Sequence, residues 1–298
     1  MCMIGRATRD ASLPEQLLFL GPASIFFAIA VLLPFAFSIF YAFTNWNGIS
    51  QEAALVGLKN FRAAFAPRSD FLNAFWFTLR MALVNIVLVT ALGTTLAVAL
   101  TTSMKLEGAF RVAFYLPQTM GGLILGFIWQ FIFVSGFPSI GKLLCLGYFT
   151  QQWLGTESTA FTALAIVSVW QGVGYVMLIM IAALSGMPKE VLESARIDGS
   201  GALRTFVKIK LPLCMPYISV CLFWTTANAL KMFELNFSLT KGGPYGSTVS
   251  MAMNIYNDAF SKNKYGLATA ESLIFFVIIL AITSLQMGFT KRKEKEYL

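Results

Sequence analysis

Long apolar segments are the feature that most constrains what this chain can fold into. A helix that crosses the hydrocarbon core of a bilayer needs about 20 mostly apolar residues, and the sequence contains such segments at approximately 17–43, 75–101, 114–133, 161–184, 213–236 and 273–289. Backbone polar groups find no water in lipid, so each segment is expected to be helical. The sequence therefore predicts an all-α, polytopic membrane protein whose six transmembrane helices form a single domain over residues 17–290.

The composition supports this class and argues against others. The chain is 57% hydrophobic and 12% charged, with a mean hydropathy of +0.71, values that are typical of membrane proteins. Histidine, the commonest general base and metal ligand, is absent. The four cysteines, Cys2, Cys145, Cys214 and Cys221, show no metal-binding spacing, and Cys214 and Cys221, which fall in one apolar segment, are interpreted as small apolar residues. We expect no catalytic residue and no metal site.

The distribution of Lys and Arg predicts the orientation. Cytoplasmic segments of membrane proteins carry an excess of both residues, and here they concentrate in the loop 186–211 and the tail 291–298. Both termini, residues 1–16 and 291–298, are therefore expected in the cytoplasm, next to membrane lipid. The first apolar segment is too long for a signal-peptide core and no cleavage pattern follows it, so we expect it to be retained. The same charge distribution accounts for the net charge of +8 without a nucleic-acid partner.

One polar stretch, residues 188–216, interrupts the apolar pattern with two short helical segments. Its sequence is PKEVLESARIDGSGALRTFVKIKLPLCMP. Gly199 follows Asp198 where a left-handed helix cap is expected, and Ser200 is predicted to cap a second helix running toward Ile209. A helix of roughly ten residues is marginal alone in water, so we expect this stretch to form against a partner.

This stretch resembles the signature loop of the membrane subunits of ABC importers, which reads E-A-A, three residues, G, nine residues, I-x-L-P. Glu193-Ser194-Ala195, Gly199 and Ile209-Lys210-Leu211-Pro212 keep that spacing, with Ser194 in place of the first alanine. The wider pattern, including Arg196-Ile197-Asp198 and Pro216, is similar to the carbohydrate-uptake branch. Weaker resemblances to the same branch lie at SIFYAFTNWNG (38–48), VGLKNF (56–61), RVAFYLP (111–117) and TKGGP (240–244).

The resemblance implies the permease subunit of a binding-protein-dependent ABC importer, of the maltose F or glycerol-phosphate A type, with the type I permease fold. It implies import of a sugar or oligosaccharide across a bacterial cell (inner) membrane. The implied partners are a second permease, two ATPase subunits and an extracellular or periplasmic solute-binding protein. The residues that would couple to the ATPase, within the loop 186–211, are Glu193, Ser194, Ala195, Asp198 and Gly199.

No ATPase site is predicted in this chain, so it is not expected to be an enzyme or to hold a cofactor. ATP and Mg would be bound by the partner ATPase subunits. The segment Gly136–Lys142 has the glycine and lysine of a phosphate-binding loop but lacks the following hydroxyl residue. Glu52-Ala53-Ala54 repeats the three signature letters without the glycine and the I-x-L-P, and we interpret it as coincidence.

Polar residues within spans are expected to face the bundle interior or a hydrated cavity. Measured from the signature loop, the resemblance places the substrate pathway near Ser168, Gln171, Gly172, Asn228, Ala229, Met232 and Phe233. Further polar and aromatic candidates are Arg80, Asn85, Gln130, Trp170, Tyr175, Trp224, Lys231, Glu234 and Asn236. Lys231 and Glu234 are three residues apart on a helix, so they either neutralise one another or face the pathway.

Three other functions compete with a sugar importer. The first is an ABC importer of glycerol-phosphate or another small polar solute. The second is a stand-alone secondary transporter, which predicts internal repeats and ionisable residues near the middle of the bilayer; the sequence shows no convincing repeat. The third is a membrane-embedded enzyme, which needs paired carboxylates or histidines at the membrane surface.

Overall fold

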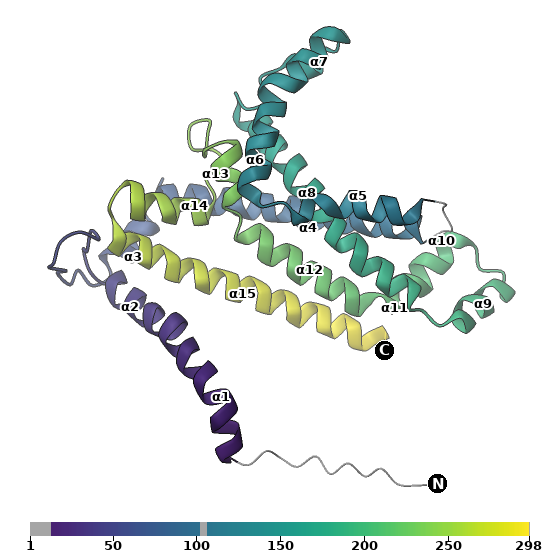
Figure 1. Cartoon of the computed structure of the whole chain (residues 1–298), viewed down its shortest axis with the longest axis horizontal. Coiled ribbons are helices and arrows are strands. Elements are labelled where there is room, and N and C mark those ends of the chain that lie inside the picture. The colour runs from purple at the N-terminus through teal and green to yellow at the C-terminus, as the bar shows by residue number, and fades with distance from the viewer. Residues whose placement is uncertain (1–12, 102–105, 298) are drawn as a thin grey trace.

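The computed structural model describes residues 13–101 and 106–297, and these form an assembly of helices (Figure 1). The α-helices are α1 (Leu13–Phe27), α2 (Leu33–Ala42), α3 (Lys59–Ala64), α4 (Asp70–Leu100), α5 (Glu107–Thr119), α6 (Gly122–Phe131), α7 (Phe137–Leu143), α8 (Glu157–Ser185), α9 (Lys189–Ile197), α10 (Ala202–Thr205), α11 (Leu211–Leu213), α12 (Met215–Leu230), α13 (Glu234–Leu239), α14 (Met251–Tyr256) and α15 (Tyr265–Tyr297). Short π segments η1 (Ala28–Leu32), η2 (Ile132–Gly136), η4 (Phe206–Lys210) and η5 (Asn257–Ser261) and the 3₁₀ turn η3 (Gly147–Thr150) join them. In the described residues, β structure is limited to one bridge between Thr44 and Leu55.

Prolines explain three of the π segments. Pro34, Pro138 and Pro212 each lie two positions after the end of η1, η2 and η4. Proline has no N–H and its ring clashes with the carbonyl four residues earlier. In each case the residue before the proline donates instead to the carbonyl five residues back, as from the Leu211 N–H to the Phe206 carbonyl. The helix thus continues through the proline at the expense of one widened turn.

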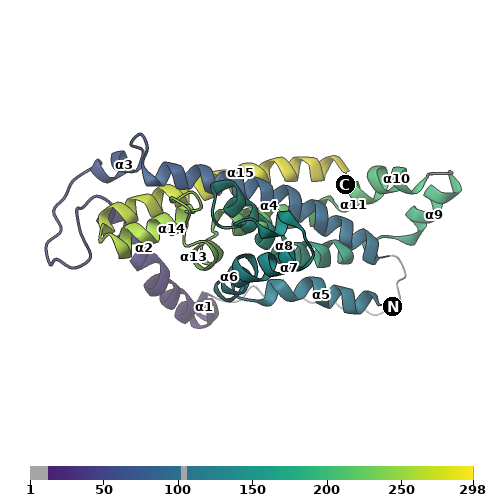
Figure 2. The ribbon, with the colours of Figure 1, turned by 90° about the horizontal axis from the view of Figure 1, so that it is seen from above.

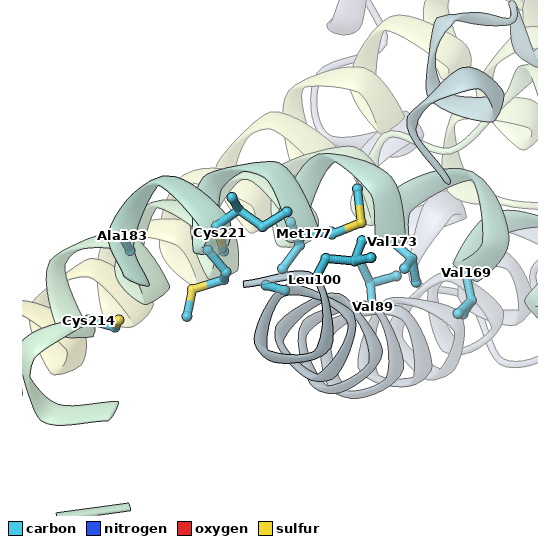
Figure 3. Packing of buried hydrophobic residues seen from close by; sticks show 12 residues of the cluster. Val89, Leu100, Val169, Val173, Met177, Ala183, Cys214 and Cys221 are labelled. Carbon is cyan, nitrogen blue, oxygen red and sulfur yellow. The ribbon is translucent and has the colours of Figure 1, made fainter. Parts of the chain in front are cut away.

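The core lies along the seam between α4 and α8, on which α5 and α12 also pack. Val89 from α4 and Val173 and Met177 from α8 are buried there, and Cys214 and Cys221 close the cluster from the α11–α12 side (Figure 3). Both cysteines are free and buried. The interpretation of these two as small apolar residues is therefore confirmed; Cys2 lies outside the described residues.

The helical class predicted from the sequence is confirmed. Within the described residues, five helices are long and apolar enough to cross a membrane, and α10–α11 with α12, bent by 72° at their junction, makes six if counted as one span. The first span, Leu20–Ala42, has no buried residue in its most apolar window, and α1 diverges from the bundle (Figures 1 and 2). Of the predicted N-terminal segment 1–16, residues 1–12 lie outside the described part.

Two predicted helices differ from the observed ones. The segment 114–133 is divided at Met120–Gly121 into α5, which lies beside α8, and α6, which with η2 and α7 points away from the bundle (Figure 1). The segment 213–236 is interrupted after Leu230, and α13 begins only at Glu234. The predicted tail 291–298 continues α15 as far as Tyr297.

An ion-pair network ties the ends of α4 and η5 together. Lys262 Nζ lies 2.9 Å from Asp70 Oδ2 and 2.9 Å from Asp258 Oδ1. Partial burial lowers the pKa of Lys262, but hydrogen bonds and attraction from the two carboxylates outweigh that effect and raise the pKa above its usual value. Asn254 donates to both Asp258 and Glu271, which joins α14 and η5 to α15.

Candidate functional site

Two interrupted helices meet near the middle of the bundle. The chain leaves helical geometry at Met120–Gly121, between α5 and α6, and again at residues 231–233, between α12 and α13. The second interruption packs on the first: the Ser238 hydroxyl in α13 donates to the Gly122 carbonyl over 3.3 Å. Gln171 in α8 donates to the Met120 carbonyl over 3.1 Å. Backbone without helical hydrogen bonds is tolerated at membrane depth where it is buried in protein or lines a cavity.

A cavity of about 370 Å³ lies at this meeting point. All seven residues that the sequence placed on a substrate pathway line it: Ser168, Gln171, Gly172, Asn228, Ala229, Met232 and Phe233. Asn85, Val89, Gln118, Gly122, Trp224, Thr225, Lys231, Glu234 and Leu235 complete the lining. The structure therefore brings together residues from α4, α5, α6, α8, α12 and α13 that are up to 150 positions apart in the chain (Asn85 to Leu235).

The amide side chains of the cavity present acceptors. Asn85 Nδ2 donates to the Met81 carbonyl over 3.0 Å and Asn228 Nδ2 to the Trp224 carbonyl over 2.8 Å, in each case one turn back on the same helix. These contacts fix both amides by their nitrogen atoms and leave the oxygens to accept other hydrogen bonds. Such an arrangement suits a ligand with hydroxyl groups.

The indole ring of Trp224 forms one wall of the cavity. Trp224 lines the cavity and stacks on Tyr175 of α8, with ring centroids 4.0 Å apart and planes 22° apart. Tyr175 thus supports the orientation of the indole from behind. A fixed aromatic face beside amide oxygens combines the apolar and polar contacts with which small-molecule sites orient their ligands.

The two charged residues of the cavity are stabilised separately. Lys231 is the C-cap of α12 and Glu234 is the first residue of α13, the positions at which helix dipoles favour a cation and an anion. A Cβ added to Gly122, the first residue of α6, would lie 2.9 Å from Glu234 Oε2, so the carboxylate also lies beside the start of a second helix. Among the described residues no ion pair joins Lys231 and Glu234. Both side chains line the cavity, so the structure shows them facing the same space without a direct ion pair.

Other sequence candidates lie elsewhere. Arg80 lines a separate cavity. Asn236 is fully buried and donates to the Thr248 carbonyl over 2.7 Å, holding the loop 240–250. Trp170 packs edge to face on Trp129, outside the cavity. Gln130 is not among the lining residues.

Sequence reasoning missed Gln118 and Thr225. Gln118 lies just after Pro117 and three residues before Gly121-Gly122, a pattern that marks a helix boundary and would have placed this residue near a break. Thr225 offered no comparable signal, because its hydroxyl donates to the Cys221 carbonyl within the helix.

The predicted coupling residues lie on α9 and the turn that follows it, at the end of the molecule beyond α11 (Figure 1). Glu193, Ser194 and Asp198 are exposed, whereas Ala195 is buried. Gly199 has φ +69°, and the Ser200 N–H bonds to the Ala195 carbonyl over 3.0 Å, the hydrogen bond of a Schellman cap. The left-handed cap predicted at Gly199 is therefore confirmed. The predicted Ser200 cap is wrong: Gly201 occupies the N-cap of α10, and the Ser200 hydroxyl accepts from Thr205 Oγ1.

Two other motifs fall on contrasting local structures. Gly136–Lys142 lies within the helical run of η2 and α7, so its backbone does not form an open loop. Glu52-Ala53-Ala54 is non-helical and lies in the connection between α2 and α3.

Comparison with known proteins places this geometry in context. Residues 90–295 match the model of the binding-protein-dependent transport system inner membrane component. The chain is 40% identical over 279 residues to the probable starch degradation products transport system permease protein AmyD of Thermoanaerobacterium thermosulfurigenes, covering 94% of each chain. It is 35% identical over 255 residues to the multiple sugar-binding transport system permease protein MsmF of Streptococcus mutans, covering 86% of this chain and 88% of that protein.

The fold also matches solved structures. A chain of a bacterial ABC transporter involved in the import of the acidic polysaccharide alginate superposes with a TM-score of 0.80 at 20% identity, covering 94% of this chain and 96% of that one. A chain of the bacterial alginate ABC transporter in complex with alginate pentasaccharide-bound periplasmic protein gives a TM-score of 0.81 at 20% identity, covering 95% and 96%. At this identity the likeness concerns the fold.

Proposed function

This chain belongs to the family of binding-protein-dependent transport system inner membrane components, and from that premise we propose that it is the permease subunit of an ATP-driven importer of a sugar or oligosaccharide. The observation that carries the proposal is the cavity between the two helix breaks. It combines a supported indole face, amide oxygens and one charge of each sign. We assign the cavity as this chain's share of the translocation pathway, with a second permease supplying the rest.

A saccharide fits the lining of the cavity better than a phosphate ester does. A site for a phosphorylated solute needs an excess of cationic donors, whereas Lys231 and Glu234 balance here and the remaining polar lining residues are neutral. The names of the relatives support the same class, because AmyD is described as carrying starch degradation products and MsmF as carrying multiple sugars. The cargo is accordingly a neutral saccharide.

The energy for transport comes from ATP hydrolysis by other subunits of the importer. Two ATPase subunits bind ATP and Mg and act on α9 through Glu193, Ser194, Asp198 and Gly199. Ala195 supports the helix from its buried side. An external solute-binding protein delivers the cargo, both termini lie in the cytoplasm, and the chain performs no covalent chemistry.

The test is uptake by the complete importer reconstituted in vesicles. We expect ATP hydrolysis to rise when the loaded binding protein is added, and radiolabelled α-1,4-linked glucose oligomers to accumulate inside. Trp224→Ala should lower uptake, while Trp170→Ala, the same change at an exposed tryptophan outside the cavity, should leave uptake near that of the wild type. Uptake driven by an ion gradient without ATP would contradict the proposal in favour of a secondary transporter.

A further inference from the structure

A second, larger cavity lies farther along the α4–α8 seam. Its volume is about 1000 Å³, and its lining comes from the first turns of α4, the first turns of α8 and the loop 245–247. No residue lines both this cavity and the one between the helix breaks. Phe77 and Phe161, packed edge to face with ring centroids 6.0 Å apart, line it on the α4 and α8 sides. Phe77 also belongs to the buried cluster that continues through Met81 and Leu164.

Arg80 is the charged residue that α4 contributes to this second cavity. α4 has 31 residues and is therefore about 46 Å long, so the roughly 30 Å hydrocarbon core spans about two thirds of its length. Arg80 is the eleventh residue of α4 and its side chain is exposed. Arg80 Nε donates to the Trp76 carbonyl over 3.3 Å, and no ion pair engages Arg80 among the described residues. A guanidinium facing hydrocarbon is costly, whereas water in the cavity would satisfy its remaining donors.

The lining has the chemistry of a saccharide site. Trp76, more than half exposed, and Tyr245, 97% exposed, supply open aromatic faces. Arg80 and Glu157 supply one charge of each sign, and Asn73 and Ser158 add neutral hydrogen-bonding groups. Aromatic faces with balanced polar groups again favour a neutral, hydroxyl-rich ligand over an anion.

The loop that carries Tyr245 is held in place from within. Thr240 Oγ1 and Thr248 Oγ1 lie 2.8 Å apart, Thr248 Oγ1 donates to the Gly243 carbonyl over 2.8 Å, and Asn236 holds the Thr248 carbonyl. These contacts fix the ends of the loop, so its backbone loses little conformational entropy when a ligand binds the exposed ring.

We propose that this cavity is an outer vestibule site that binds a neutral oligosaccharide before it passes the Phe77–Phe161 pair to the inner cavity. The proposal rests on the proposed function for the identity of the ligand. Because the vestibule is the larger of the two cavities, it accommodates more sugar rings than the inner site. Its contribution should therefore grow with the length of the saccharide.

The first part of the test measures uptake by the complete importer of α-1,4-linked glucose oligomers of two and six units. Trp76→Ala should lower the rate for the six-unit oligomer about fivefold, the loss expected for one aromatic contact. The rate for the two-unit oligomer should change much less, and Trp170→Ala serves as the matched control. Equal losses for both lengths, or no loss for either, would overturn the vestibule site.

The second part measures access directly. In a variant whose native cysteines are replaced by serine, Ser158→Cys should react with a membrane-impermeant maleimide added outside, and the six-unit oligomer delivered by its binding protein should slow that reaction. Absence of labelling in a transport-competent protein would overturn a hydrated vestibule. Equal protection by the binding protein without sugar would overturn the saccharide and assign the cavity to a protein contact. If the wild-type importer takes up neither oligomer, the assignment of these saccharides as the cargo is wrong. The labelling of Ser158→Cys then decides by itself whether the hydrated vestibule exists.

Discussion

The inner cavity and α9, the proposed coupling helix, are built in opposite ways. The cavity is held by contacts between distant parts of the chain, such as Gln171 to Met120 and Ser238 to Gly122. The helix α9 is held by local geometry, chiefly the left-handed turn at Gly199, and Glu193, Ser194 and Asp198 remain exposed.

This difference fits the two roles proposed for the cavity and for α9. A site that must keep a fixed shape for a ligand needs support from several elements, and the cavity has it. An element that docks on another protein keeps its contact residues exposed until the partner arrives, and α9 does so. We therefore expect changes in α9 to uncouple transport without altering the cavity, and changes at the helix breaks to alter the cavity without affecting docking.

The largest effect is expected from Glu193→Lys. Reversing a charge at a docked interface costs several kcal/mol, so uptake should fall about thirtyfold or more, while the protein still inserts and binds its partner permease. The matched control is Glu52→Lys, the same change in the unrelated Glu-Ala-Ala triplet of the α2–α3 connection. Normal uptake by a stably inserted Glu193→Lys protein would remove α9 from the coupling role.

A smaller loss is expected from Gly122→Ala. A Cβ at Gly122 would lie 2.9 Å from both Glu234 Cβ and Glu234 Oε2, whereas a Cβ at Gly121 would meet nothing within 4 Å. Overpacking of this kind typically costs 1–3 kcal/mol, so uptake should fall about tenfold with ATPase cross-linking unchanged. Gly121→Ala should behave as the wild type. Equal behaviour of the two variants would show that the contact between the breaks does not shape the cavity.

Gly199→Val tests the local support of α9. The φ of +69° costs an L-residue roughly 1–2 kcal/mol, so ATPase docking should weaken about tenfold, measured as the loss of binding-protein-stimulated ATP hydrolysis. Gly201→Val is the control, because Gly201 has φ −66° and, like Gly199, open space around its Cβ position. Gly199→Asn should retain most of the activity, since Asn tolerates the left-handed conformation.

The smallest effect concerns the charges of the cavity. If Lys231 and Glu234 are each stabilised by a helix end, Lys231→Met and Glu234→Gln should be additive. In a double-mutant cycle on thermal stability of the purified complex, the coupling energy should then stay below about 0.5 kcal/mol. A larger favourable coupling energy would show that Lys231 and Glu234 stabilise one another directly. The charges of the cavity would then depend on a contact within it and not on the two helix ends.

The contrast between the locally supported α9 and the cavity, which is supported by distant parts of the chain, also explains which parts of the structure could be predicted from the sequence. The α9 turn follows from Asp198-Gly199 by local rules, and the long apolar helices follow from composition. The break at residues 231–233 was not predictable, because Lys231-Met232-Phe233 has no helix-breaking residue and the contact of α13 with α6 is visible only in three dimensions. The break at Met120–Gly121 was signalled by Pro117 and two glycines, but the apolar run across it favoured one continuous helix. The pathway residues were placed by resemblance, and only the three-dimensional structure shows them around one cavity.

The most direct test of the account is a cross-link from α9 to the ATPase. Ser194→Cys is the suitable probe, because Ser194 is exposed whereas Ala195 is buried. The variant, free of other cysteines, is co-expressed with its ATPase subunits and treated with a bifunctional thiol reagent with and without ATP. The account predicts a cross-linked permease–ATPase product whose yield changes with ATP. A correctly inserted protein that gives no such product under either condition would contradict it.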